Sequence, residues 1–129
     1  MDAAQALTEL RELSSQVARA VVFEDGGEVL AGTDADQAAV EELADAARAL
    51  VAAAGGLHAT EGDVSRAEVE LADGGFFVLR EGGRTIAATT GPDPTAGLVV
   101  YDLRTCLSSI DAKPKRRRTT KKQVEEAAE

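Results

Sequence analysis

Few side chains in this sequence could perform covalent or acid–base chemistry. His58 is the single histidine and Cys106 the single cysteine, and they lie far apart in the sequence. A histidine can act as a general base and a cysteine thiolate as a nucleophile. Cys106, however, falls at helical spacing from Leu103 and Leu107, which favours a buried structural thiol, and His58 stands in a glycine-flanked loop. We therefore predict a protein that is not an enzyme, with chemistry at His58 or Cys106 as the weaker alternative.

Two acidic, glycine-containing stretches could be considered for nucleotide or metal binding. Gly26 and Gly27 lack the GxxxxGK[ST] spacing of a phosphate-binding loop, and the acidic neighbours Glu24, Asp25 and Glu28 would repel phosphate. Neither EDGGE nor DADQ matches the Asp-rich calcium loop. The sequence also has no dinucleotide fingerprint and no nucleophile elbow. We expect no catalytic residue, no cofactor and no metal.

Charge divides the chain into an acidic body and a basic segment. Residues 1–112 hold 20 acidic and 7 basic residues and so carry −13, whereas residues 113–129 hold 7 basic and 3 acidic residues and carry +4. We interpret 1–112 as one domain and 113–129 as a tail, basic and then acidic, that we expect to be disordered. Because the body repels phosphates and anionic lipids, nucleic acid or membrane would be contacted only weakly, through the tail.

The tail sequence KPKRRRTTKK has four interpretations. It could serve solubility alone, contact an acidic protein surface, attract phosphate or membrane weakly, or be regulated by phosphorylation. The last interpretation rests on Thr119 and Thr120, which directly follow three arginines, a pattern that many basophilic kinases favour. The regulatory candidates are Arg116, Arg117, Arg118, Thr119 and Thr120.

Composition limits which residue types can form the core and indicates the cellular compartment. Hydrophobic residues make up 44% of the chain but aromatic residues only 3%, so a core must be built from Ala, Val and Leu. The apolar stretches are broken within roughly a dozen residues, too short to span a bilayer, and no signal peptide is visible. A single cysteine fits a reducing compartment. We predict a cytoplasmic protein.

The elements follow from hydrophobic periodicity and turn residues. A helix is predicted over 3–17, a hairpin over 20–33, and a second, alanine-rich helix over 39–54, capped by Asp34 or Asp36 and ended by Gly55. SRAEVEL, FFVLRE and TIAATT are predicted strands. A third helix, with Asp93 as cap and Pro94 at its first position, should end near Asp111. The order α-β-β-α-β-β-β-α predicts an α+β sandwich with a five-stranded antiparallel sheet and flanking helices.

Two long segments resemble one known family. LTELRELSSQVARAVVFEDGGEVLAG and GRTIAATTGPDPTAGLVVYDLRTCLSSI, in this order of elements, resemble the roadblock/dynein-light-chain family over roughly Leu7 to Ile110. The alanine-rich composition looks like that of a high-GC bacterial member of the small-GTPase-regulator type. This resemblance implies a profilin-like or longin-like sandwich and a homodimer, in which the second helices pair and the third strands join edge to edge.

The implied interface includes charged residues on the third strand. With the two-fold axis at Glu68, Arg66 would oppose Glu70 of the partner subunit and Glu68 would face its own copy; a shift of register removes these pairs. The expected dimer interface comprises Ala39, Leu43, Ala46, Ala47, Leu50, Arg66, Glu68 and Glu70.

The resemblance also implies a function and a partner. Family members bind Ras-like small GTPases as activators, scaffolds or platforms, so the protein is expected to be a non-catalytic regulator that supplies no nucleotide site of its own. Outward residues of the second helix, Glu41, Asp45 and Arg48, are the candidate GTPase contacts. The alternative is a dimeric adaptor for another signalling partner, such as a sensor kinase, or a module that senses a small ligand.

Overall fold

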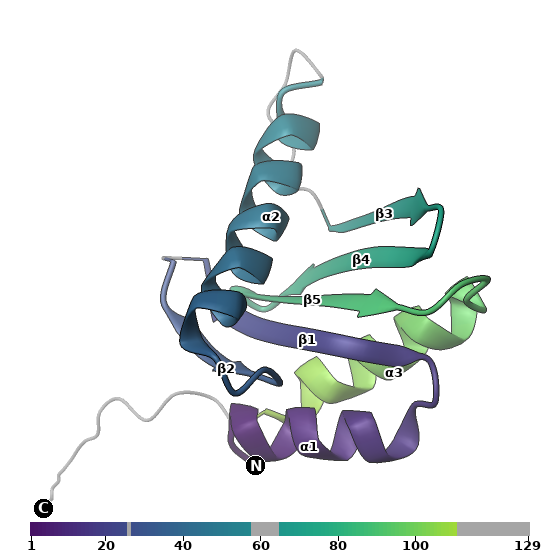
Figure 1. Ribbon diagram of the computed structural model, residues 1–129. Helices are drawn as coiled ribbons and strands as arrows, with labels where there is room; N and C mark the ends of the chain where they lie inside the picture. Colours follow the sequence, from purple (N-terminus) through teal and green to yellow (C-terminus); the bar gives the residue numbers. More distant parts are fainter. Residues whose placement is uncertain (26, 58–64, 111–129) are drawn as a thin grey trace, which may run out of the picture.

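The structure, a computed structural model, describes residues 1–25, 27–57 and 65–110 (Figure 1). The predicted fold class and element order are confirmed over this part of the chain. The elements are α1 (Ala3–Leu13), β1 (Val17–Glu24), β2 (Val29–Gly32), α2 (Gln37–Gly55), β3 (Arg66–Leu71), β4 (Gly74–Glu81), β5 (Arg84–Thr90) and α3 (Ala96–Ser109).

The five strands form one antiparallel sheet in the order β2-β1-β5-β4-β3. The β3–β4–β5 meander follows from two short turns. The contact of β1 with β5 joins this meander to the β1–β2 hairpin, from Val17 opposite Thr90 to Glu24 opposite Arg84. As a result β2 and β3, which are far apart in the sequence, form the two edges of the sheet.

Helices cover both faces of the sheet, and each face has its own core (Figure 1). Alternation along β1 sends Ala20 and Val22 towards α1 and α3, and Val21 and Phe23 towards α2. The α1/α3 core contains Leu7, Leu10, Phe77, Leu79, Ile86, Val99 and Leu103. The α2 core is smaller and contains Val40, Leu43, Ala44, Ala47, Val78 and Ala87.

The first helix is shorter than its apolar pattern predicts. It ends at Leu13 rather than at Val17, because the Ser14 hydroxyl accepts hydrogen bonds from the backbone N–H groups of Gln16 at 3.2 Å and Val17 at 3.3 Å. Such a side-chain acceptor competes with the helical ladder. Val17 begins β1 instead, and Leu13 is left 77% exposed.

The caps of the other helices differ partly from expectation. Asp36 caps α2 by accepting from the Ala38 N–H at 3.1 Å, while Asp34 binds the Arg19 guanidinium at 2.9 Å. Gly55 is the last helical residue and Gly56 follows it as the C-cap. For α3 the predicted cap was wrong: Asp93 has a left-handed backbone with φ 54°, which is not a capping conformation. Thr95 is the N-cap, and α3 ends at Ser109 rather than near Asp111.

Candidate functional site

Strand β3 is an open edge of the sheet. It pairs with β4 on one side only, with Arg66 opposite Leu79 and Leu71 opposite Gly74. The Arg80 N–H donates to the Ser65 carbonyl at 2.9 Å, which fixes the phase of the ladder. Because antiparallel strands alternate between the two sides, Ala67, Val69 and Leu71 direct their backbone groups at β4. The N–H and C=O groups of Arg66, Glu68 and Glu70 therefore point away from the sheet.

An unpaired edge with outward N–H and C=O groups is a template for another strand. The three residues with outward backbone groups are also the three charged residues of β3. Their side chains lie on the α1/α3 face, since Glu68 stands opposite Phe77 of that core. Arg66 and Glu68 interact at 3.6 Å between Nε and Oε2. The predicted interface residues of β3 are thus accessible to a second strand.

The α2 face beside β3 is only partly covered. Helix α2 packs over β1, β2 and β5, so the apolar side chains nearer the β3 edge are half-buried. Leu50 and Val51 of α2, with Ala67 and Phe76 of β3 and β4, lie at the margin of the α2 core. Leu71, at the end of β3, is 50% exposed. A partner that docks here would bury apolar surface that the single chain leaves in contact with water.

The predicted interface residues of α2 divide into two groups. Leu43 is 6% exposed and Ala47 is 0% exposed, because both side chains pack on the chain's own sheet. We therefore assign these two to the core and not to a partner surface, a correction of the sequence-based interpretation. Ala39 and Leu50 are half-buried and Ala46 is exposed.

Sequence reasoning included Ala46 but missed Ala49 and Ala53, which complete the small-residue stripe that α2 presents to solvent. Ala46, Ala49 and Ala53 are all exposed and follow one another at spacings of three and four, so they share one helix face. The same spacing in the sequence could have identified them. Alanines on an exposed face allow another helix to approach closely, because no long side chain stands between the two backbones.

The three candidate partner contacts on α2 differ in how strongly their side chains are bound by other residues of the same chain. Glu41 and Asp45 are exposed, and Gln37 donates to the Glu41 carboxylate at 3.3 Å. Arg48 lies with its guanidinium carbon 4.8 Å from the centroid of the Phe23 ring. It also donates to the Asp45 carboxylate at 2.7 Å and to the Gly27 carbonyl. Arg48 is therefore committed to holding α2 on the β1–β2 hairpin.

Chemistry at Cys106 is suppressed by its position. The thiol is 5% exposed in the α1/α3 core, and burial, together with the nearby Glu9 carboxylate, raises its pKa from 9.0 to about 11. A thiol with so high a pKa holds very little thiolate at neutral pH and is a poor nucleophile. His58, the other candidate, lies outside the described residues.

Three further predictions can be compared with the structure only over the residues that it describes. The tail candidates Arg116, Arg117, Arg118, Thr119 and Thr120 all lie beyond residue 110 and outside the described part. Among the residues that are described, no three His, Cys, Asp or Glu side chains gather closely enough to hold a metal ion. Within the same residues, every helix is too short or too polar to cross a bilayer.

Comparison with known proteins gives matches in structure but not in sequence. No protein-family model matches the chain, and no curated protein matches it. A Roadblock/LC7 domain from Streptomyces avermitilis superposes with a TM-score of 0.73 at 23% identity, covering 84% of this chain and 94% of that one. Myxococcus xanthus MglB gives 0.60 at 16% identity, covering 82% and 79%. The gliding protein MglB from Thermus thermophilus gives 0.56 at 18% identity, covering 81% and 82%.

These matches each cover between 81% and 84% of this chain. The identities are low, so the likeness is one of architecture. The resemblance that the element order predicts is thereby confirmed at the level of the fold, and the chain has the fold of the Roadblock/LC7 domains.

Proposed function

We propose that the protein is a homodimeric, non-catalytic member of the roadblock family that regulates a Ras-like small GTPase in bacterial signalling, in the cytoplasm. The observation that carries the proposal is the Roadblock/LC7 fold together with an open β3 edge beside a partly covered α2. Solved structures with this fold include MglB, once with a tetrameric arrangement, and the family resemblance implies small GTPases as partners.

Self-association is favoured by the chemistry of the β3 edge. In an antiparallel pairing of two β3 strands, only outward-facing residues can exchange backbone hydrogen bonds. A two-fold axis at Glu68 meets this condition, since Arg66, Glu68 and Glu70 all face outward. The register places Arg66 opposite Glu70 of the partner subunit twice, which offsets the contact of Glu68 with its own copy.

The same assembly would close the exposed parts of the α2 face. Two copies joined along β3 bring their α2 helices to one side of a continuous sheet. The half-buried Leu50 and Phe76 and the exposed stripe of Ala46, Ala49 and Ala53 would then lie near the joint. Burial of apolar area contributes about 25 cal/mol per Å², so the dimer gains from surface that the single chain cannot cover.

A GTPase would dock on the joint α2 surface. Glu41 and Asp45 are exposed on the first half of this helix, away from the apolar margin near β3. They can form ion pairs with basic side chains of a partner, which favour fast and specific association more than raw affinity. We keep Glu41 and Asp45 as contacts and assign Arg48 to supporting Asp45, because its guanidinium holds that carboxylate in place.

The proposal is tested with purified Ras-like GTPases from the same organism, each loaded with GDP or with a non-hydrolysable GTP analogue. We expect one of them to bind in a manner that depends on the nucleotide, and its rate of GTP hydrolysis or nucleotide exchange to change. Glu41→Lys and Asp45→Lys should weaken this binding, while Glu12→Lys, an exposed reversal on α1, should not. If no GTPase binds in either nucleotide state, the regulatory function is wrong.

A further inference from the structure

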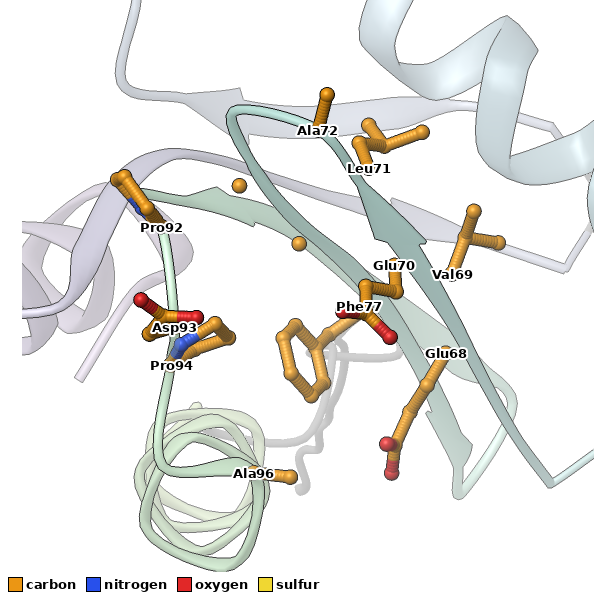
Figure 2. A pocket seen from close by; sticks show the side chains of 12 residues that line it. Glu68, Val69, Glu70, Leu71, Ala72, Phe77, Pro92, Asp93, Pro94 and Ala96 are labelled. Atoms are coloured by element: carbon orange, nitrogen blue, oxygen red, sulfur yellow. The ribbon is translucent and has the colours of Figure 1, made fainter.

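A groove opens on the α1/α3 face of the β3–β4 hairpin, between this hairpin and the loop that leads into α3 (Figure 2). Its volume is about 610 Å³. Phe77, 4% exposed, forms the apolar floor. The loop residues Pro92 and Pro94 and the first residue of α3, Ala96, form one wall, and β3 forms the other.

The groove exists because Gly75, near the start of β4, leaves room. A Cβ added to Gly75 would lie 2.9 Å from the Phe77 ring and 3.3 Å from Pro94. Both neighbours line the groove, so any larger residue at position 75 would narrow it. On this face α3 covers β4 and β5, and nothing in the described chain covers the outer half of β3.

The groove is acidic. Figure 2 shows the side chains of Glu68 and Glu70 leaving β3 on the side of Phe77, while Val69 leaves on the opposite side. Asp93 adds a third carboxylate from the opposite wall. None of the described residues that line the groove is basic; the nearest base on β3 is Arg66, 3.6 Å from Glu68. The N-terminus of α3 adds only about half a positive charge, so the net charge stays negative.

The segment KPKRRRTTKK, residues 113–122, carries the complementary charge. It holds seven basic residues in ten, on a chain whose first 112 residues carry −13. Arginine suits such a groove better than lysine, because its planar guanidinium binds carboxylates in a bidentate manner and stacks on aromatic rings. Arg116, Arg117 and Arg118 therefore match both the carboxylates and the apolar floor.

The distances allow the segment to reach the groove. The groove lies at the N-terminal end of α3, and the segment leaves from the C-terminal end. Helix α3 has 14 residues and is roughly 21 Å long at about 1.5 Å per residue. Eight extended residues, 111–118, span about 26 Å. The arginines can thus return along α3 to its first turn.

The side of α3 along this route is already suited to a basic segment. Arg104 donates to the Glu81 carboxylate at 2.7 Å, which shows that this side of α3 faces the last residue of β4. Tyr101 and Gly97 follow at helical spacing on the same side. Tyr101 is 66% exposed and offers an aromatic face to a passing arginine or lysine.

We propose that the basic segment of this chain, residues 113–122, docks in the acidic groove between β3 and the Pro92–Pro94 loop, with its arginines on Glu68, Glu70 and Asp93. The docked segment neutralises part of the acidic body and covers the outer half of β3 on this face. Each phosphate group on Thr119 or Thr120 would remove about two of the seven positive charges of the segment and so weaken its docking. The inference does not depend on the GTPase proposal.

The docking is tested on the full chain with a spin label. Thr120→Cys introduces a second thiol, on the basic segment, whereas the buried Cys106 reacts poorly because its pKa is raised. A nitroxide at position 120 should broaden the backbone amide NMR signals of Glu70, Phe77 and Ala96, and leave those of Glu41 and Glu42 on α2 sharp. The broadening should be lost at high salt.

Matched variants decide whether the acidic groove is the site. Glu70→Gln and Asp93→Asn should each reduce the broadening, and the second lies away from the β3 edge, so it is independent of any effect on dimerisation. Asparagine also tolerates the positive φ of position 93. Glu41→Gln with Glu42→Gln removes charge from α2 and should leave the broadening unchanged.

Two results would overturn the docking. The first is broadening over α2, or broadening that is insensitive to Glu70→Gln and Asp93→Asn, because the segment would then have another site. The second is the absence of any broadening in the free protein, with immobilisation of the label only after anionic vesicles or duplex DNA are added. The basic segment would then bind a membrane or nucleic acid and not the groove. A mixture of spin-labelled and isotope-labelled chains shows whether the segment enters its own groove or that of the partner.

Discussion

Replacing Glu68 by proline tests whether two copies of the chain pair along β3, because it removes a single backbone N–H from this edge. The N–H of Glu68 points away from β4, so Glu68→Pro removes a donor that the single chain does not use. Proline is tolerated at edge positions of this kind, and it restricts the preceding residue to the extended backbone that Ala67 already has in β3. We expect the variant to fold and to lose the ability to pair β3 with a second copy.

The size of the effect follows from the hydrogen bonds lost. With the two-fold axis at Glu68, the two copies of this residue exchange two N–H···O=C bonds, and the substitution removes both donors. At about 1 kcal/mol net for each bond, the dimer loses about 2 kcal/mol, or roughly 30-fold in its dissociation constant. The proline rings also occupy the gap of ~4.8 Å between the strands, so this figure is a lower bound.

The assay is sedimentation over a dilution series, with Glu68→Thr as the matched control. The control removes the same carboxylate but keeps the N–H, and it should dimerise at least as tightly as the natural chain because the two glutamates no longer repel each other. Glu70→Pro, at the next outward position, gives a second test should the first variant be unstable. A folded Glu68→Pro protein that dimerises as tightly as Glu68→Thr would refute pairing along β3.

Three further predictions concern the single chain. Gly74→Ala should destabilise it by at least about 2 kcal/mol in chemical denaturation, because the new Cβ would lie 2.0 Å from a backbone carbonyl oxygen of β5; Gly97→Ala, whose Cβ meets nothing within 4 Å, should be neutral or stabilising by less than about 1 kcal/mol. Arg48→Ala should cost about 1–2 kcal/mol through its lost contact with an aromatic ring and a carbonyl, and Arg104→Ala, in an exposed ion pair, less than about 1 kcal/mol; equal losses would contradict the role of Arg48. Alkylation of Cys106 at pH 8 should be about a hundredfold slower in the folded than in the unfolded protein, because the rise of its pKa from 9.0 to about 11 lowers the thiolate fraction by that factor; rapid alkylation of the folded protein would show that the thiol is accessible.

Local sequence patterns predict the elements better than their ends. The strands of the meander follow from alternation and from Asp-Gly and Gly-Gly turns, so β3, β4 and β5 were found from the sequence. The end of α1 was not, because Leu13 and Val17 continue the apolar period of the helix and only the hydroxyl of Ser14 interrupts it. The cap of α3 was misplaced because Asp93 and Pro94 form a typical capping pair, whereas the backbone of Asp93 is left-handed.

The interaction surface was predictable only in part. Alternation identified SRAEVEL as a strand with one charged face, but the position of β3 at the sheet edge depends on the pairing of β1 with β5, a contact between distant segments. On α2 the alanines look alike in the sequence. Only packing shows that Ala47 faces the sheet and Ala46 faces solvent. The groove beside Phe77 is formed by β3, β4 and the loop that leads into α3. These segments are separate in the sequence, so no local pattern could predict the groove.

The exchange of the Glu68 backbone amide with solvent deuterium tests the central claim most directly, because this N–H has no acceptor within the sheet of a single chain. Two copies joined along β3 predict that it exchanges slowly at high protein concentration and speeds up on dilution, while the Val69 amide, bonded to β4, stays slow throughout. Rapid exchange of Glu68 at every concentration, with Val69 still protected, would show that the edge stays open in solution and would contradict the dimer.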